Sequence, residues 1–190
     1  MARRIHARLR AGVLSLAVTT ATSLAVAQGG GATSPEARLK AAGIELPPTP
    51  KAVANYVPAV RTGNLVFLAG QGPLADGKPT VTGKVGAEVT EEAGYRAART
   101  TILNSLAALR AEIGSLDRVR RIVKVTAWVN SAPGFTRQPF VVNGASDLLV
   151  QVFGEAGRHA RTAVSANELP FNIPVEIEMI VEVAPEPAGR

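Results

Sequence analysis

The chain of 190 residues contains no cysteine. Disulfide bonds, iron–sulfur clusters, thiolate zinc sites and cysteine nucleophiles are therefore excluded. Histidine is nearly as scarce: only His159 lies beyond the first ten residues, which also excludes an HExxH motif or a His-rich metal site. Aromatic residues make up only 4 %, and none forms a stacking series beside a basic cluster. The composition thus lacks the side chains of thiolate and histidine-rich metal sites, and it lacks an aromatic series for stacking bases.

The positive charge is concentrated at the N-terminus. Lys and Arg number 21 against 15 Asp and Glu, so the net charge is +6. Four of the arginines lie in the first ten residues: Arg3, Arg4, Arg8 and Arg10. An uncharged and mostly apolar run follows at residues 11–27 and ends in Ala25-Val26-Ala27. A basic start, an apolar stretch and an A-x-A end are the parts of a secretory signal peptide.

We therefore predict that residues 1–27 form a signal peptide that is cleaved near Ala27. The mature protein would be exported to the periplasm or the cell exterior, with no stable membrane anchor. Two alternatives stay open: an uncleaved anchor, and export by the twin-arginine route through Arg3-Arg4. Cleavage removes four arginines and no acidic residue, which lowers the net charge from +6 to +2. A nearly neutral domain gives no electrostatic reason to expect nucleic acid as a partner.

Apolar spacing predicts helices and strands in the remainder of the chain. Ser34-Pro35-Glu36 is typical of a helix start, so residues 28–53 are interpreted as a linker with a short N-terminal helix. Thr90 begins a long helix that ends near Ile113, because its apolar residues recur every three or four positions. The other expected elements are a hairpin at 56–60 and 65–69, a turn at 75–79, a strand at 122–130, a helix at 143–153, and strands at 161–166 and 175–183.

The alternation of apolar and polar residues in the strands indicates a sheet with one buried face. In the last strand the expected core residues are Val175, Ile177, Met179, Val181 and Val183, opposite Glu176, Glu178 and Glu182. In the strand at 122–130 they are Val123, Val125, Ala127 and Val129, opposite Ile122, Lys124, Thr126 and Trp128. We predict a single α+β domain at 54–185, followed by a tail at 186–190, with two main helices on one face of a mixed sheet. Its acidic face must then meet water or a partner subunit.

Several motifs that are typical of known enzymes or binding proteins are absent, or lack the structural surroundings that their function requires. Gly70-Gln71-Gly72 resembles a dinucleotide-binding loop, but a turn at 75–79 follows where a helix is required. The chain has no G-x-x-x-x-G-K-[ST] loop and no G-x-S-x-G elbow. A basic cluster is interpreted as a solvated loop between helix and strand; it comprises Arg118, Arg120, Arg121 and Lys124.

The C-terminal third carries a more specific pattern. Residues 161–170 match R-x-x-V-x-x-x-x-L-P, and V-E-I-E follows at 175–178. Three dipeptides of the expected hairpin and one residue near the second helix match the same pattern: Tyr56-Val57, Gly63-Asn64, Gly70-Gln71 and Asn143. Together these motifs resemble the RidA family, also called YjgF/YER057c/UK114, from about Ala54 to Val183 in one unbroken order.

This resemblance implies a chorismate-mutase-like fold, a homotrimer with sites in clefts between subunits, and hydrolysis of reactive 2-imino acids and their enamines to 2-keto acids and ammonia. Arg161 would bind the substrate carboxylate, because guanidinium offers it paired hydrogen bonds. Glu176 would position or activate the attacking water. Tyr56 and Asn143 would line the cleft, and Gly70 would let backbone approach the ligand. No metal or organic cofactor is implied.

The chain departs from this family's pattern at two cleft positions. Ala69 stands where deaminase members carry Ser, and Ala163 stands where they carry Cys. Both departures remove polar groups, which indicates a divergent member of the family; the predicted signal peptide would make it an exported one. An alternative function is a non-catalytic trimeric module that binds small carboxylate metabolites. RNA cleavage, an older description of the family, is a third possibility.

Overall fold

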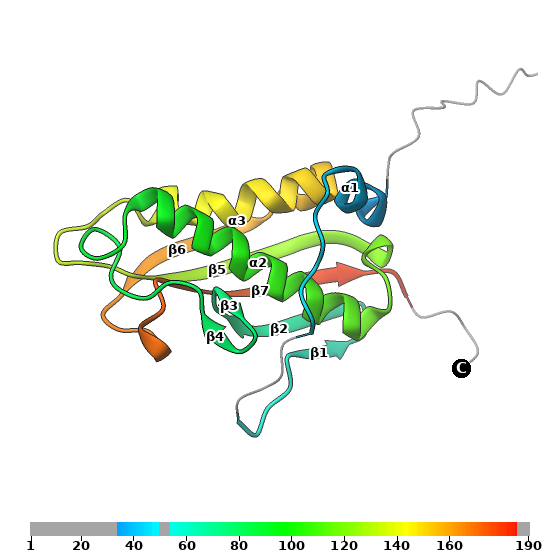
Figure 1. Ribbon diagram of the computed structural model, residues 1–190. Helices are drawn as coiled ribbons and strands as arrows, with labels where there is room; N and C mark the ends of the chain where they lie inside the picture. The colour runs from blue at the N-terminus through cyan, green and yellow to red at the C-terminus, as the bar shows by residue number, and fades with distance from the viewer. Residues whose placement is uncertain (1–33, 50–53, 186–190) are drawn as a thin grey trace, which may run out of the picture. The chain divides into compact units, whose positions relative to one another are not determined.

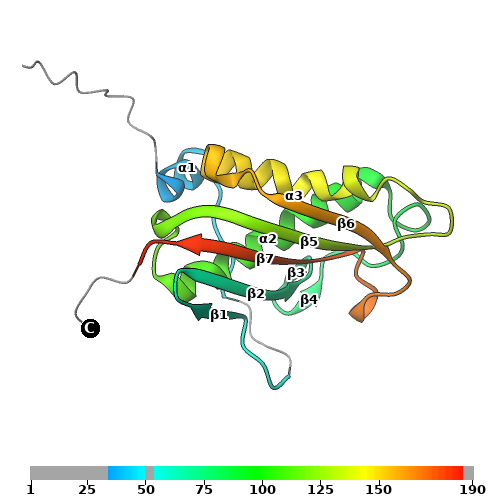
Figure 2. The same cartoon turned by 180° about the vertical axis from the view of Figure 1, so that it is seen from behind.

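Two long helices lie on one face of a mixed β-sheet in the computed structural model, and the opposite face is left uncovered by them (Figures 1 and 2). The structure describes residues 34–49 and 54–185. The predicted signal peptide, the C-terminal tail and parts of the predicted linker lie outside these ranges. Within the described residues, no helix has the length and apolar character to cross a bilayer.

The helices and strands follow the chain in this order: α1 (Pro35–Ala41), β1 (Ala59–Thr62), β2 (Leu65–Gln71), β3 (Leu74–Ala75), β4 (Lys78–Pro79), α2 (Glu91–Ile113), β5 (Val119–Asn130), α3 (Gln138–Phe153), β6 (Ala160–Ala166) and β7 (Val175–Val183). Three short 3₁₀ turns accompany them: η1 (Leu116–Arg118), η2 (Gly154–Gly157) and η3 (Pro170–Asn172). The main sheet has the order β1-β2-β7-β5-β6, in which β5 and β6 run parallel and the other neighbours antiparallel. The predicted α+β class, with two main helices on one face, is confirmed.

The buried face of the sheet largely follows the predicted alternation. The five core residues expected in β7 are each at most 1 % exposed, and Val125, Ala127 and Val129 of β5 are fully buried. The prediction is wrong at the start of β5, where Ile122 is buried and Val123 only partly so. A register shift between Ile122 and Lys124 explains the difference, because one extra residue moves the preceding side chains to the other face.

The two main helices begin for different reasons. Thr90 caps α2 by accepting the Ala93 amide at 3.2 Å, and Gly114 ends the helix with a φ of 83°, both as predicted. Helix α3 starts at Gln138, five residues before the predicted start. Arg137 stands at its N-cap and makes no side-chain capping bond, so the sequence carries no capping signal there. Instead the Gln138 side-chain amide donates to Ser131 Oγ at 3.2 Å and to the Phe135 carbonyl at 2.8 Å.

Helix α1 completes the helical layer beside α3 (Figure 1). Ser34 caps it by accepting the Ala37 amide at 3.4 Å, which agrees with the predicted helix start. Leu39 is only 3 % exposed, and Glu36 accepts the Leu116 amide at 3.0 Å. The helix is therefore attached to the core by one buried leucine and one hydrogen-bonded carboxylate.

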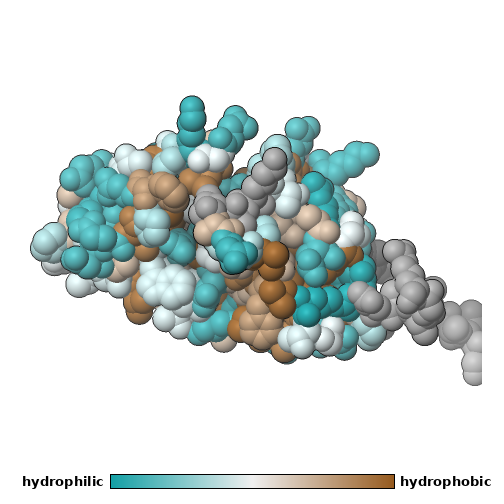
Figure 3. Space-filling model, turned by 90° about the horizontal axis from the view of Figure 1, so that it is seen from below, coloured by the Kyte–Doolittle hydropathy of each residue, from teal (hydrophilic) through white to brown (hydrophobic). Residues whose placement is uncertain are grey.

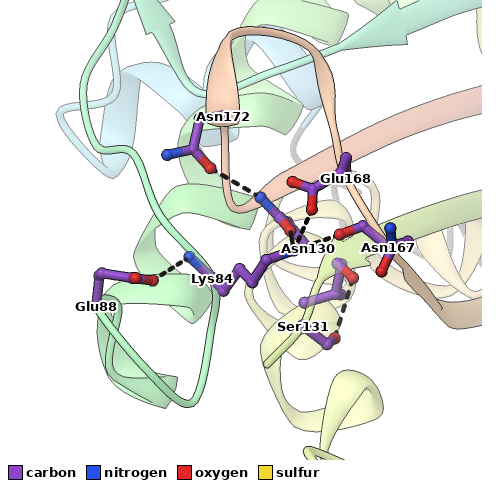
Figure 4. Close-up of polar contacts among 8 residues, drawn as sticks. Lys84, Glu88, Asn130, Ser131, Asn167, Glu168 and Asn172 are labelled. Atoms are coloured by element: carbon purple, nitrogen blue, oxygen red, sulfur yellow. Dashed lines mark hydrogen bonds and ion pairs between the residues drawn. The ribbon is translucent and has the colours of Figure 1, made fainter. Parts of the chain in front are cut away.

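A lysine-centred network fixes the loop that carries the chain from β6 to β7 across the end of β5 (Figure 4). Lys84 Nζ donates to Asn130 Oδ1 at 2.9 Å and to the Asn167 carbonyl, and it pairs with Glu168 at 3.1 Å. The Asn130 amide in turn donates to Asn172 Oδ1 at 3.2 Å. These bonds use the three hydrogens of the ammonium and set the point at which β7 enters the sheet.

We expect Gly144→Ala to destabilise the protein by about 2 kcal/mol, because overpacking a tight contact typically costs that much. A Cβ on Gly144 would overlap the backbone carbonyl oxygen of Tyr95, where α3 crosses α2, and neither helix backbone can move alone. Urea-induced unfolding measures the effect. Gly94→Ala is the matched control at the same crossing, since its Cβ would meet only valine methyl groups at 3.2 Å or more. Equal stabilities of the two variants would contradict the expectation.

Candidate functional site

The residues expected to form the site separate into two groups on opposite faces of the sheet. Arg161 on β6 pairs with Val125 of β5, and Glu176 on β7 pairs with Trp128 of β5. Val125 and Trp128 are three residues apart, and successive side chains of a strand point to opposite faces. Arg161 therefore lies on the helix-covered face and Glu176 on the uncovered face. Because β5 also separates the two strands, about 10 Å of sheet lies between them. Within one chain the two side chains do not meet.

Arg161 and Asn143 do meet, at the edge of the sheet formed by β6. Arg161 Nη1 donates to Asn143 Oδ1 at 2.9 Å and to Ser146 Oγ at 3.0 Å. Asn143 and Ser146 are three residues apart on α3 and so share one face of that helix. Asn143 lies inside α3 rather than at its start, where the sequence had placed it. Its observed role is to hold the arginine.

The remaining edge of the guanidinium is open. The two bonds to α3 use both hydrogens of Nη1. Among the described residues, no group accepts from Nε or Nη2 of Arg161. The hydrogens of these two nitrogens are parallel and match the spacing of the two carboxylate oxygens. Ala163, one of the two departures from the family's pattern, follows two residues later on the same face. The half-buried arginine thus presents a paired donor edge.

His159 joins this group through Ser146. Its Nε2 lies 3.2 Å from Ser146 Oγ, and its Nδ1 lies 2.7 Å from the Gly157 carbonyl oxygen. Burial lowers the pKa of His159; the bond to Gly157 opposes this shift, and the charge of Arg161 adds to it. The net shift favours the neutral form of the imidazole.

Glu176 and Gly70 form the second group, at the other face. A Cβ on Gly70 would overlap Oε1 of Glu176, so the carboxylate lies directly over the Gly70 backbone and only glycine leaves room for it. The segment before β1 reaches the same end of β2, because the Pro58 carbonyl accepts the Ala69 amide at 2.9 Å. Tyr56, 47 % exposed, belongs to this segment.

The environment of Glu176 makes it a candidate acid–base group. Burial raises the pKa of the Glu176 carboxyl above its ordinary value, and the neighbouring charge of Glu178 adds to the rise. A carboxyl shifted in this direction can accept and return a proton closer to neutral pH. The shift in the pKa of Glu176 is a local effect, because Glu176 and Glu178 lie on the same face of β7.

The uncovered face of the sheet is chemically mixed. Exposed apolar side chains of β1, β2 and β6 accompany the β7 acids on this face: Val60, Phe67 and Val164. Figure 3 views the molecule from below, toward the edge of the sheet formed by β1, where hydrophobic side chains also lie beside hydrophilic ones. Within the described residues, no group of three or more His, Asp or Glu side chains could hold a metal ion.

Sequence reasoning missed two members of the Arg161 group. These are Ser146 and His159, and the motifs of the sequence include neither. The available signal was the spacing of Asn143 and Ser146, which places both on the α3 face next to β6. No periodicity predicts that His159, in the turn before β6, reaches the same serine.

The fold and the arginine site place the protein in the class of α+β proteins with a chorismate-mutase-like fold. A family model described as "YjgF/chorismate mutase-like, putative endoribonuclease" matches residues 36–183. The chain therefore belongs to the YjgF family, as its motifs indicated.

Several relatives have closely similar sequences. "Protein TCP17" of Trypanosoma cruzi is 45 % identical over 148 residues, which cover 77 % of this chain and 92 % of the relative. The crystal structure of protein Atu1372 from Agrobacterium tumefaciens, titled as of unknown function, is 46 % identical with a TM-score of 0.73, covering 78 % of this chain and 92 % of its own. A Shewanella oneidensis structure titled "putative endoribonuclease" is 37 % identical with a TM-score of 0.76, covering 79 % and 99 %.

We expect Glu176→Gln to raise the melting temperature at pH 7. The folded state raises the pKa of Glu176, so its stabilising contribution is present below the unfolded pKa and is lost as pH rises through the folded pKa. The substitution removes the unfavourable charge at pH 7 but changes little near about pH 4, where the carboxyl is largely protonated. Thermal unfolding at both pH values tests this. Glu45→Gln, at an exposed carboxylate, should show no such pH-dependent gain. A gain of equal size at both pH values would contradict the assignment.

Proposed function

We propose that the protein is a hydrolase that converts 2-imino acids and their enamine tautomers to 2-keto acids and ammonia. The observation that carries the proposal is the open Nε–Nη2 edge of Arg161, which Asn143 and Ser146 hold in place through Nη1. A substrate with a carboxylate next to its C=N bond fits such a paired donor. Binding at this edge would fix the position of the reacting carbon, and orientation supplies much of the acceleration in such reactions.

Glu176 would carry the proton transfers. As a base it takes a proton from the water that adds to the C=N carbon of the protonated imine, giving a neutral carbinolamine. As an acid it returns that proton to the amino nitrogen. The C–N bond then breaks, ammonia leaves, and the Glu176 carboxylate takes the hydroxyl proton as the carbonyl forms. The raised pKa of the Glu176 carboxyl supports both directions of transfer. The Gly70 backbone, over which the carboxylate lies, would form one wall of the cleft, and we propose that Tyr56, in the segment before β1, lines it as well.

The proposed site combines two subunits of a homotrimer. Arg161 and Glu176 lie on opposite faces of one sheet, so one chain cannot bring both to one substrate molecule. A neighbouring chain whose uncovered face meets the β6 edge would supply Glu176 to Arg161. The exposed apolar side chains on the uncovered face support such a contact. We also propose that the enzyme acts after export and cleavage near Ala27.

Mixing two inactive variants tests the shared site. Arg161→Ala and Glu176→Gln should each reduce turnover of an imine generated in solution by about 100-fold or more, since each removes a binding or acid–base group. When the variants are unfolded and refolded together in equal amounts, about a quarter of the interfaces receive both intact groups, and activity returns to that level.

The control mixture contains Arg161→Ala and the double variant Arg161→Ala/Glu176→Gln, which cannot form an intact site and should stay inactive. Light scattering confirms that every preparation is trimeric. Failure of the first mixture to regain activity would refute the shared site. Wild-type protein that binds pyruvate but shows no turnover would favour the carboxylate-binding module, and cleavage of RNA by a nuclease-free preparation would favour the older family description.

A further inference from the structure

We propose that Ser146 and His159 are positioning residues that keep the donor edge of Arg161 directed at the substrate carboxylate. This inference rests on the proposed function, since it concerns the same carboxylate-binding group. Neither residue belongs to the pattern by which the family was identified. The geometry alone assigns them to the site, through a continuous chain of hydrogen bonds from Gly157 to Arg161.

The direction of every bond in this chain follows from one carbonyl. The Gly157 oxygen can only accept, so the hydrogen of His159 lies on Nδ1. In the neutral imidazole Nε2 then carries a lone pair, and Ser146 must donate its hydroxyl hydrogen to it. The lone pairs of Ser146 Oγ are thereby left for Arg161 Nη1, which donates at 3.0 Å. A serine hydroxyl that would otherwise rotate freely is fixed as an acceptor.

The consequence for Arg161 is that both Nη1 hydrogens have fixed partners. Asn143 Oδ1 takes one and Ser146 Oγ takes the other, so the planar guanidinium cannot turn about the Cδ–Nε bond without breaking a hydrogen bond. With only Asn143 in place, the plane could tilt and the Nε–Nη2 edge would lose its direction. Preorganising a binding group in this way increases affinity because less freedom is lost on binding.

The partially buried state of the group suits this role. Asn143, Ser146, His159 and Arg161 are all half-buried, which limits competition from water. Gly157 is buried, so the carbonyl that fixes the tautomer is itself held in place by η2. The arrangement therefore extends from a rigid turn, through the imidazole and the hydroxyl, to the cation.

Two substitutions of His159 separate the two bonds of the imidazole. His159→Gln supplies an acceptor near the Nε2 position and can still receive the Ser146 hydroxyl. His159→Asn supplies a donor near the Nδ1 position and keeps the bond to Gly157, but it offers Ser146 nothing. If the imidazole positions Arg161 through Ser146, only the Gln variant preserves the function.

The measurement is the affinity of the trimer for pyruvate by calorimetry at pH 8, where His159 is neutral. We expect His159→Asn and Ser146→Ala to bind about five-fold more weakly than wild type, since one hydrogen bond contributes about 1 kcal/mol and 1.4 kcal/mol is ten-fold. His159→Gln should stay within about two-fold of wild type, and Ser146→Ala/His159→Asn should be no weaker than either single variant, because both act through one bond. Melting temperatures show whether each variant is folded.

Two results would overturn the inference: wild-type affinity in Ser146→Ala, or a His159→Gln variant as weak as His159→Asn. The first result would show that the Ser146 hydroxyl does not help to position Arg161. The second would show that His159 only stabilises the turn at Gly157. Arg161→Ala separates this failure from failure of the proposed function. If Arg161→Ala still binds pyruvate as wild type does, the carboxylate site itself is wrong; if it does not, only the roles of Ser146 and His159 are in question.

Discussion

The alternation of side chains along β5 is the constraint on which the arrangement of the site depends. This strand pairs with β6 on one side and β7 on the other, so its register places Arg161 under the helices and Glu176 on the open face. Neither residue can change face without a one-residue slip of its own strand, and such a slip of β7 would also turn its five buried core residues outward. The hydrophobic core and the position of the two functional groups are thus determined by the same pairing.

The arginine illustrates how a fold can prepare a charge for a ligand. Burial of a cation is unfavourable unless it is hydrogen-bonded, and here one nitrogen is satisfied by α3 while the opposite edge stays open. The surroundings of Glu176 have the opposite effect, since burial and the neighbouring Glu178 disfavour its ionised form. The first group is stabilised in its charged state and the second is not, which is the division expected between a binding group and an acid–base group.

Most of the fold could be predicted from the sequence because its signals are local. Thr90 and Gly114 mark the ends of α2 by capping, and β7 alternates strictly. Helix α3 begins earlier than predicted because Gln138 bonds to residues of the preceding loop, and Ile122 faces the core because of a bulge; both depend on tertiary contacts. In the site, the motif identified Arg161 and Asn143, but their contact, and the participation of Ser146 and His159, follow from the packing of α3 on β6. The alternation of side chains within each strand limits Arg161 and Glu176 to one face or the other. Predicting that they lie on opposite faces also requires the order and register of β6, β5 and β7, which the sequence does not show.

Under the proposed function, the placement of Arg161 and Glu176 on opposite faces would also link catalysis to protein concentration. Under the proposed assembly, a dissociated chain carries both halves of the site and completes neither. Dilution below the concentration at which the trimer dissociates would therefore abolish activity without unfolding the chains. As the protein concentration rises again, the activity would increase more steeply than the concentration itself. A protein delivered singly to a new compartment would begin to work only after enough copies had gathered there.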